Sequence, residues 1–336
     1  SSVMWMRIIQ KHAGIAMNTI PLTLDSYRPT YTVIGGSRIA QSTEHHPVSI
    51  LLINRGPRPY RSAAITELLK AGFHSIVSIE TGADTPELEA IASRTPALRY
   101  ICMHEEHNPG ICINIGIRES LAPYVLVLWN DMRLASSALS SRFFERVLEL
   151  DHACLAPMFF DSDGAVVPSV THPAQSGKAF RVVQLNPLKD GEKSLFPFDY
   201  SGIYSREKFI MLGGYDWTLQ NPYWQKLDFG LRCWLWGETI SHVQALKIKF
   251  EGSLAVEDHS YDEDYDKFWL KNLAPVYRGD SAYIPLSKFF GYMWSSKKHL
   301  SASVMDFSAA RNWVKACSYR FKADASCLAG LWDPMP

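Results

Sequence analysis

The stretch PVSILLINRGPRPYRSAAITELLKAGFHSIVSIE, residues 47–80, holds one strand–helix–strand unit. Its first part, Val48–Ile53, is a continuous apolar run, as in a strand that is buried on both faces. Residues 59–70 repeat apolar side chains at helical spacing, and Gly72 stands where such a helix would end. Ile76–Ile79 is a second short apolar run. Because a helix joins two buried strands, the sequence predicts parallel strands in one sheet.

The same alternation continues along the chain. Residues 84–87 begin a helix with a capping residue, a proline and an acidic residue. Residues 98–103 and 124–129 are predicted strands, and residues 111–120 form the helix between them. In a parallel sheet, ligands bind outside the carboxyl ends of the strands. We therefore expect a binding site near the segments that follow Ile53, Ile79, Met103 and Leu128.

The composition is that of a globular chain without a charge bias. Of the 336 residues, 47% are hydrophobic and 20% are charged, which suits a protein with a sizeable core. Lysine plus arginine number 34, as do aspartate plus glutamate, so no basic surplus points to a nucleic-acid partner.

Cysteine usage and hydropathy suggest a compartment. The six cysteines form no CxxC pair and show no zinc-ligand spacing, which suits a reducing environment. The first residues show no basic segment followed by a long apolar run. Nor does any stretch reach the roughly 18 apolar residues of a membrane-spanning helix. We expect a cytoplasmic protein, of an oligomeric state that the sequence does not reveal.

Three short segments carry weaker signals. Gly35-Gly36 follows an apolar run, but without a G-x-G-x-x-G pattern it favours a plain turn over a dinucleotide loop. Asp161–Gly164 is interpreted as a hairpin turn, because the later ligands of a calcium loop are missing. The acidic run over 262–266 is expected to be a solvated face.

Several motifs follow the predicted strands in a fixed order. They read Ile79-Glu80-Thr81-Gly82-Ala83-Asp84, Asn108-Pro109-Gly110 through Ile117, Val127-Leu128-Trp129-Asn130-Asp131-Met132, Gly213-Gly214-Tyr215-Asp216 and Gln225-Lys226-Leu227-Asp228 through Arg232. In this order and spacing the chain resembles the family 2 glycosyltransferases, over about Val48 to His259. The resemblance implies an α/β GT-A-like single domain, with a mostly parallel sheet flanked by helices. We assign it to residues 47–270, between an N-terminal extension (1–46) and a C-terminal helical extension (271–336).

The resemblance also implies which residues bind a nucleotide-sugar donor. The loop after the first strand cups the nucleotide base, an acidic residue accepts hydrogen bonds from the base or ribose, and a glycine turn approaches the sugar. The corresponding residues here are Ile53, Asn54, Glu80, Asn114, Asn130, Gly213, Gly214 and Asp216. Structural roles compete with this assignment: Glu80 can cap a loop, Asn114 can sit in a packed helix, and Asp216 can bond its own turn.

A divalent metal is implied by the same family. Its Leu-Asp-x-Asp motif holds Mn²⁺ or Mg²⁺, which bridges the two phosphates of the donor. Here Trp129 stands at the first Asp position, Asn130 follows it and Asp131 remains. His259 falls where relatives place a histidine that completes the metal site. We predict Asp131 and His259 as ligands of Mn²⁺ or Mg²⁺, against an Asp131 that only caps a turn.

The catalytic acids of the family are largely replaced. Where relatives carry a general base, this chain has Gln225 and Lys226, followed by Asp228. We predict Asp228 and Lys226 as catalytic residues, although Asp228 can instead pair with Arg232 one helical turn later. The replacements leave two rival hypotheses open. One is a nucleotide-sugar-binding or scaffolding protein without turnover, and the other is a metal-independent transferase in which Lys226 stabilises the leaving diphosphate.

The expected function is transfer of a sugar from a nucleotide-diphosphate sugar to a hydroxyl acceptor, either a glycan or a lipid-linked glycan. An aromatic cluster at residues 289–294 precedes Lys297 and Lys298. It suits an interfacial helix that makes peripheral membrane contact through residues 289–298, or else a helix packed on the core.

Overall fold

The computed structural model describes residues 29–36, 46–55, 59–71, 73–82, 85–135, 139–176, 179–254 and 256–332. Among them, nine strands form the main sheet: β1 (Tyr31–Gly35), β2 (Val48–Ile53), β3 (Ile76–Thr81), β4 (Leu98–Met103), β5 (Tyr124–Trp129), β6 (Met132–Leu134), β7 (Cys154–Phe160), β10 (Gly202–Ser205) and β11 (Ile240–Phe250). Two small antiparallel sheets pair β8 (Val170–Ser176) with β9 (Ala179–Leu185) and β12 (Val276–Arg278) with β13 (Ser281–Tyr283).

The α-helices are α1 (Pro59–Lys70), α2 (Thr85–Arg94), α3 (Pro109–Glu119), α4 (Ser141–Leu150), α5 (Arg206–Met211), α6 (Pro222–Leu235), α7 (Glu263–Phe268), α8 (Lys288–Ser296) and α9 (Leu300–Cys317). Shorter helical turns are η3 (Phe198–Tyr200), η4 (Trp269–Leu273), η5 (Ser318–Arg320) and η6 (Ala325–Leu331). None of the helices in this described part of the chain is both long and apolar enough to span a membrane.

The main sheet is mixed, but most of its strands point the same way. Its order is β1-β4-β3-β2-β5-β10-β7-β11-β6. Parallel ladders join β4 to β3, β3 to β2, β2 to β5 and β7 to β11, whereas β10 is antiparallel to both of its neighbours. The predicted fold class, an α/β domain with a mostly parallel sheet flanked by helices, is confirmed.

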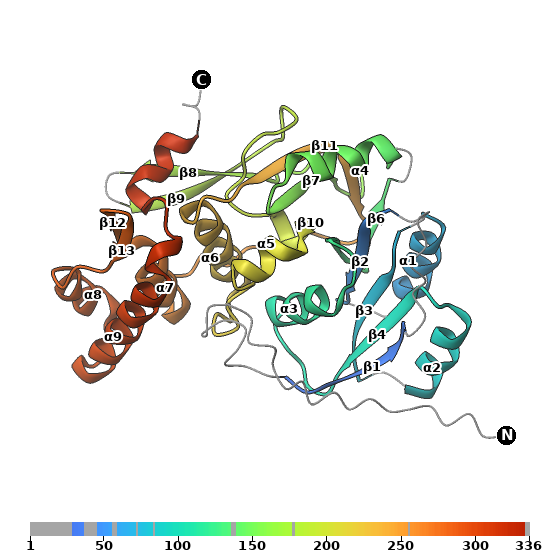
Figure 1. Cartoon of the computed structure of the whole chain (residues 1–336), viewed down its shortest axis with the longest axis horizontal. Coiled ribbons are helices and arrows are strands. Elements are labelled where there is room, and N and C mark those ends of the chain that lie inside the picture. Colours follow the sequence, from blue (N-terminus) through green and yellow to red (C-terminus); the bar gives the residue numbers. More distant parts are fainter. Residues whose placement is uncertain are drawn as a thin grey trace.

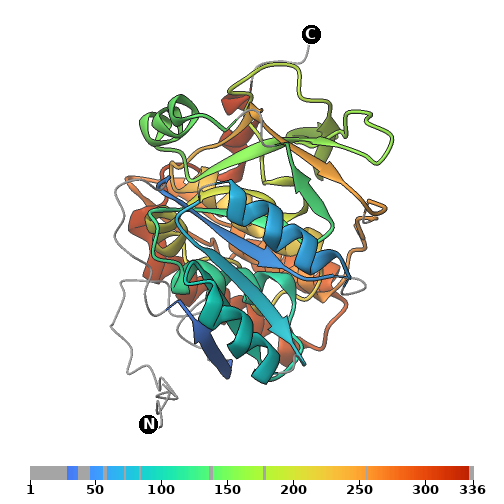
Figure 2. The same ribbon diagram turned by 90° about the vertical axis from the view of Figure 1, so that its right-hand side faces the viewer.

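Helices cover both faces of the sheet. In Figure 1, α1 and α2 lie on one side of β2, β3 and β4, and α3, α5 and α6 lie on the other. Figure 2 shows α1 and α2 in front of these strands. Val48–Ile53 and Tyr124–Trp129 are buried along their whole length, which explains why both read as continuous apolar runs.

The predicted elements are close to the observed ones. Helix α6, which carries Gln225, Lys226 and Asp228, begins at Pro222, because the side chain of Asn221 caps it and proline suits the first turn. Residues 31–35 extend the sheet as β1, antiparallel to β4, so sheet structure begins before residue 47. The proposed domain boundaries stay predictions. Gly72, Ala83 and Asp84 lie outside the described residues.

The acidic run at the start of α7 is a solvated face only in part, because Asp262 and Glu263 are exposed whereas Asp264 is buried. Asp262 caps α7. Asp264 is buried and accepts hydrogen bonds from the backbone N–H groups of Gln220 and Asn221 at 2.6 and 2.7 Å. These acids therefore tie α7 to the start of α6. Asp161–Gly164 does form a turn, in which the Asp161 N–H donates to Ala165 O.

The direction of β10 decides what meets at the site. The residues after β2 and β5 leave the carboxyl edge of the parallel strands. Because β10 is antiparallel to β5, the residues that precede β10 lie at this same edge. The segment 198–201 therefore joins the loops after β2 and β5, and it brings Asp199 to them.

Candidate functional site

Four predicted donor residues do meet at the carboxyl edge. The N–H of Asn130 donates to Ile53 O at 2.9 Å, and Asn130 Oδ1 accepts the N–H of Arg55 at 3.1 Å. Asn54 Nδ2 donates to Ile79 O at 2.6 Å, so the loop after β2 is tied to β3 next to Glu80. These contacts join the ends of β2, β3 and β5.

Glu80 lies within β3 rather than after it. Its side chain is buried and accepts a hydrogen bond from Ser78 Oγ at 2.7 Å. The Glu80 carboxylate lies at the carboxyl edge of the sheet, where a base or ribose is expected to bind, but it already accepts a hydrogen bond from Ser78. Its role in binding a donor stays a prediction.

Arg55 occupies the centre of this edge. Its Nε donates to Asp131 Oδ2 and its Nη1 donates to Asp199 Oδ2, both at 2.7 Å. The guanidinium also lies over the ring of Trp129, 4.6 Å from the centroid, as in a cation–π contact. Burial disfavours the charge of Arg55, but the two carboxylates outweigh this and raise its pKa. We name Asn54, Arg55, Asn130, Asp131 and Asp199 the edge cluster.

The sequence analysis missed both Arg55 and Asp199. Arg55 stands directly after Asn54, in a loop that we had already marked, so its positive charge was a usable signal. Asp199 precedes a strand, whereas the rule for parallel sheets points to residues that follow strands. Its partner Trp129 explains its placement, because the indole Nε1–H donates to Asp199 O at 2.8 Å.

Asp199 and Tyr200 adopt the left-handed backbone conformation, with φ of 49° and 61°. Such residues cost about 1–3 kcal/mol each unless their surroundings hold them. The hydroxyl of Tyr200 donates to Gln225 Oε1 at 2.9 Å, which holds the second of them. Burial raises the pKa of the Asp199 carboxyl, although the charges of Arg55 and Lys226 oppose this.

Three buried polar atoms of the edge cluster have no hydrogen-bond partner within the described part of the chain. They are Asn54 Oδ1, Arg55 Nη2 and Asp131 Oδ1. Buried polar groups are almost always paired, so atoms like these point to a missing ligand or water. The cluster therefore offers two acceptors and one charged donor that the protein itself leaves unused.

The residues present do not fit the predicted divalent cation. Asp131 already carries the Arg55 guanidinium, and a second cation beside it would be repelled. His259 is exposed and stacks on the ring of Tyr223, with centroids 4.1 Å apart. No group of three or more His, Cys, Asp or Glu side chains among the described residues is arranged to hold a metal ion. We therefore derive no chemistry from a metal here.

Asn114 and the Gly213-Gly214 turn contact one another rather than an open cleft. Asn114 Nδ2 donates to Tyr215 O, and Asn114 Oδ1 accepts the Tyr215 N–H, both at 2.8 Å. Gly214 has a φ of +66°, and a Cβ there would lie 2.4 Å from Asn114 Oδ1. The glycine is thus required by the close approach of Asn114. The donor-binding role that we predicted for Asn114, Gly213 and Gly214 stays a prediction.

Gln225 closes the amino end of α3. Its Oε1 accepts the N–H of Gly110 at 3.1 Å, and its Nε2 donates to Asp216 O at 2.9 Å. The N–H of Ile111 is also satisfied, by Asn108 Oδ1. We expected this helix terminus to favour a diphosphate. Its N–H groups at Gly110 and Ile111 already donate to side chains of the protein.

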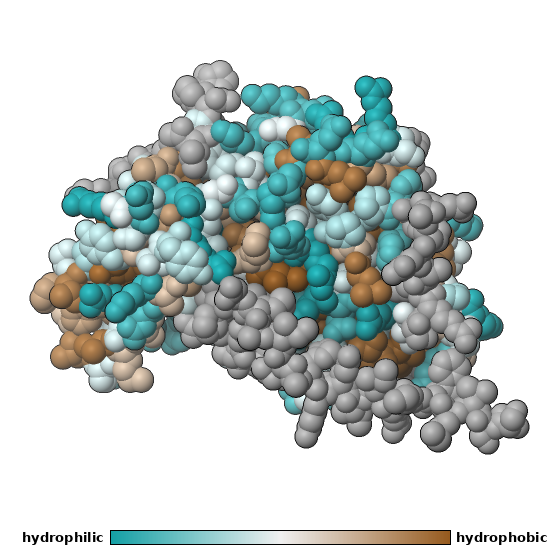
Figure 3. Space-filling model, viewed as in Figure 1, coloured by the Kyte–Doolittle hydropathy of each residue, from teal (hydrophilic) through white to brown (hydrophobic). Residues whose placement is uncertain are grey.

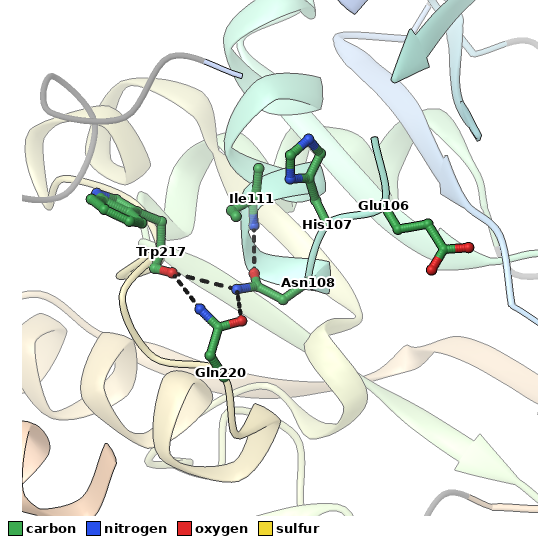
Figure 4. A pocket seen from close by; sticks show the side chains of 6 residues that line it. All are labelled: Glu106, His107, Asn108, Ile111, Trp217 and Gln220. Atoms are coloured by element: carbon green, nitrogen blue, oxygen red, sulfur yellow. Dashed lines mark hydrogen bonds between the residues drawn. The ribbon is translucent and has the colours of Figure 1, made fainter. Parts of the chain in front are cut away.

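A shallow, open hollow of about 410 Å³ lies beside this helix terminus. Figure 4 shows its polar rim, where Asn108 donates to Gln220 Oε1 and Gln220 donates to Trp217 O. His107 and Glu106 point away from these hydrogen bonds. Gln225 links the two places, since it contacts both Asn108 and Tyr200.

Asp228 is fully buried, and this burial contradicts the role of catalytic base that we predicted for it. Its side chain is 0% exposed, and it accepts from Arg232 at 2.5 Å, Asn272 at 2.8 Å and Lys271 at 3.0 Å. Burial opposes its ionisation, but Arg232 and Lys271 outweigh burial and hold its pKa below the ordinary value. An acceptor hydroxyl has no access to such a carboxylate. The ion pair with Arg232, the alternative left open by the sequence, is the one observed.

Asp216 belongs to the same set of contacts. Its Oδ2 accepts from Lys271 at 2.6 Å, and its Oδ1 accepts from Thr218. Asp216 thus bonds its own turn, as in the structural alternative, and it also joins Asp228 through Lys271. We name Asp216, Asp228, Arg232, Lys271 and Asn272 the buried network.

Lys226 is the remaining predicted catalytic residue. Its ammonium is buried and pairs with Glu257, and it lies 5.2 Å from the ring centroid of Tyr200. This lysine contributes a second positive charge near Asp199. Its pairing with the Glu257 carboxylate leaves it poorly placed to accept a proton from an acceptor hydroxyl.

Comparisons with known proteins place the chain only loosely. No family model matches it, and no curated protein does. A crystal structure of S. aureus TarS 1–349 in complex with UDP-GlcNAc has 13% identity and a TM-score of 0.49, over 81% of this chain and 73% of that one. A crystal structure of GalNAc-T7 with UDP, GalNAc and Mn²⁺ has 15% identity and a TM-score of 0.48, over 68% of this chain.

The chain matches only about half of GalNAc-T7, 51% of its length, and 43% of the longer S. aureus TarS chain. All these TM-scores lie below 0.5. These likenesses therefore assign neither a family nor an activity, and the function has to be argued from the site itself.

Proposed function

We propose that this protein binds a nucleotide-diphosphate sugar at the edge cluster and transfers the sugar to a hydroxyl acceptor. One observation carries the proposal. The loop after β2, the end of β3 and the loop after β5 meet where the family resemblance expects the donor, with unpaired buried atoms on Asn54, Arg55 and Asp131. A ligand with anionic oxygens and hydroxyl groups matches this set of one charged donor and two acceptors.

The reaction is a displacement at the anomeric carbon. The bond from this carbon to the phosphate oxygen breaks, and a bond to the acceptor oxygen forms. The nucleoside diphosphate leaves with the electron pair. Its terminal phosphate, whose second pKa is about 6, takes up the hydroxyl proton. No general base from the buried network is needed in this scheme, since Asp228 is inaccessible.

A second candidate is binding without turnover. Its specific support is that each acid of the motifs is engaged: Asp131 by Arg55, and both Asp216 and Asp228 by Lys271. Such a protein would keep the donor site as a sensor or scaffold. The two candidates share the donor site and differ only in hydrolysis and transfer.

The test is titration calorimetry of the full chain with UDP, GDP and their sugars, combined with donor hydrolysis in the same samples. Binding with release of nucleoside diphosphate supports transfer. Binding without release, also in the presence of simple sugar acceptors, supports the second candidate. If none of the nucleotides binds at about millimolar concentration, where specific binding is worth only about 4 kcal/mol, both candidates are wrong.

We also propose that the C-terminal helices contact an anionic membrane surface. The aromatic cluster at residues 289–294 divides between the two predicted alternatives, packing on the core and exposure for membrane contact. Phe289 and Tyr292 pack against Phe307. Phe290 and Trp294, one helical turn apart on α8, are 69% and 86% exposed. Figure 3 shows hydrophobic side chains gathered at this end of the molecule.

Charge argues for the kind of partner. Residues 286–315 carry five Lys or Arg side chains against one Asp, a net charge of +4 in a chain whose total formal charge is zero. Basic residues beside exposed aromatic side chains on a helix are typical of binding to anionic lipid surfaces. The acceptor in such a setting would be lipid-linked.

The measurement is co-sedimentation with phosphatidylglycerol-containing vesicles and with phosphatidylcholine vesicles. We expect binding to the anionic vesicles alone, and its loss in the double variant Phe290→Ser, Trp294→Ser. A matched control is Leu188→Ser, because Leu188 is 81% exposed but lies in another part of the chain. Equal sedimentation of the double variant and the wild type would contradict the proposal.

A further inference from the structure

Arg55 stands where the family resemblance expects a metal ion. Asp131 is the remaining carboxylate of the metal motif, and its Oδ2 accepts the Nε–H of Arg55 at 2.7 Å. The Asp199 carboxylate holds Nη1 from the other side at 2.7 Å. A guanidinium held in this way is a fixed cation between two acids, which is the electrostatic position of a divalent ion in such a site.

The third arm of this guanidinium is unused. Arg55 Nη2 is buried and has no hydrogen-bond partner among the residues that the structure describes. A buried, charged donor without a partner is costly, so a ligand oxygen placed against it gains correspondingly. The planar fork of arginine matches phosphate oxygens, and stacking on Trp129 fixes its plane.

The surrounding charges can admit an anion. Two carboxylates, Asp131 and Asp199, face the single charge of Arg55. Lys226, in a pair with Glu257, adds a positive charge near Asp199. Burial raises the pKa of Asp199. A raised pKa of Asp199 weakens the negative charge that faces an approaching phosphate.

We propose that the Arg55 guanidinium binds the diphosphate of the nucleotide sugar in place of a divalent cation, with Asp131 and Asp199 holding it in position. This rests on the proposed function, since it names the group that recognises the donor. It explains together the loss of the first metal acid to Trp129, the exposed stacking of His259, and the unpaired Nη2.

The experiment measures UDP binding by calorimetry with EDTA and with Mn²⁺, on the wild type and on Arg55→Lys. We expect equal wild-type affinity in both conditions and a loss of about tenfold or more in Arg55→Lys, because lysine cannot reproduce the fork. The matched control is Arg99→Lys. Arg99 also pairs with a carboxylate, Glu119, at 2.8 Å, but it lies on β4, outside the edge cluster. The affinity of the Arg99→Lys variant for UDP should stay within about twofold of the wild-type affinity.

A second variant separates the arginine from a metal. Asp131→Asn leaves an amide oxygen that can accept the Nε–H of Arg55 and removes only the negative charge beside the phosphate, so UDP binding in EDTA should tighten. If Asp131 is instead a metal ligand, the same change should weaken binding in Mn²⁺. Circular dichroism checks that each variant is folded.

The outcomes distinguish this inference from the proposed function. Wild-type binding that needs Mn²⁺, or equal binding by Arg55→Lys and the wild type, overturns the role of Arg55 and leaves the donor site in place. A wild type that binds no nucleotide in either condition overturns both.

Discussion

Two arginine–aspartate pairs in this molecule differ in nearly everything but their chemistry. The Arg55–Asp131 pair of the edge cluster joins two loops, and the Arg55 side chain is 23% exposed. The Arg232–Asp228 pair of the buried network lies within one helix, and its side chains are 1% and 0% exposed. Asp228 has three donors around it, whereas one oxygen of Asp131 has none among the described residues. The comparison teaches that a retained motif acid can be structural, and that the functional charge can be one that no motif marks.

The largest expected effect is on the buried pair. Asp228→Asn should lower the free energy of unfolding by about 3–5 kcal/mol, because it leaves Arg232 and Lys271 buried without their shared carboxylate. Urea denaturation followed by circular dichroism measures this. Asp163→Asn, at an exposed turn, serves as the control and should change stability by less than about 0.5 kcal/mol. A loss below about 1 kcal/mol for Asp228→Asn would contradict our account of the buried network.

The glycine turn should behave as part of the same network, because Gly214 O accepts a hydrogen bond from Arg232 at 2.8 Å. Gly214→Ala should cost about 2–4 kcal/mol, from the left-handed backbone and from the clash with Asn114. Comparison with Gly279→Ala separates the cost of the clash from the cost of the left-handed backbone. Gly279 also has a positive φ, of 56°, but a Cβ there would meet nothing within 4 Å. Equal losses in the two variants would show that the Asn114 contact contributes nothing.

The pKa of Asp228 gives a pH-dependent prediction. Because its folded pKa lies below the unfolded value of about 3.9, the stability it contributes is complete above that value and is lost as the pH falls. The stability difference between the wild type and Asp228→Asn should therefore narrow by about 1.4 kcal/mol for each pH unit below about 4. Denaturation curves from about pH 7 to about pH 3 measure it. A difference that stays constant with pH would show that Asp228 is not the titrating group.

The smallest effect on stability is expected at the edge. Asp131→Asn should change the free energy of unfolding by no more than about 1 kcal/mol, because the pair is partly exposed and Arg55 keeps Asp199. The same denaturation measurement applies. If this variant lost as much stability as Asp228→Asn, the distinction between an accessible pair and a structural pair would fail.

The sequence predicted the frame of the molecule better than the chemistry of its site. Buried strands are visible as apolar runs, and Val48–Ile53 and Tyr124–Trp129 were placed with their correct bounds. The pairing of Asp228 with Arg232 was visible as an i, i+4 spacing. Lys271, which joins Asp216 to Asp228, comes from η4, and nothing in the local sequence connects it to α6.

Asp199 was missed for a topological reason. The rule that ligands meet the ends of parallel strands directs attention to residues after strands. A reversed strand delivers the residues before it to the same edge, and the reversal of β10 depends on pairing across the sheet rather than on local pattern. Arg55, by contrast, was missed although its position was marked, because the family motif assigns that loop to the base.

The indole of Trp129 holds two parts of the edge cluster at once. It lies under the Arg55 guanidinium and donates to the backbone of the left-handed Asp199. An aspartate placed at position 129 would remove both contacts at once, and it would free the strained loop before β10. An engineered metal site at this edge would therefore require the redesign of residues 198–201 together with position 129.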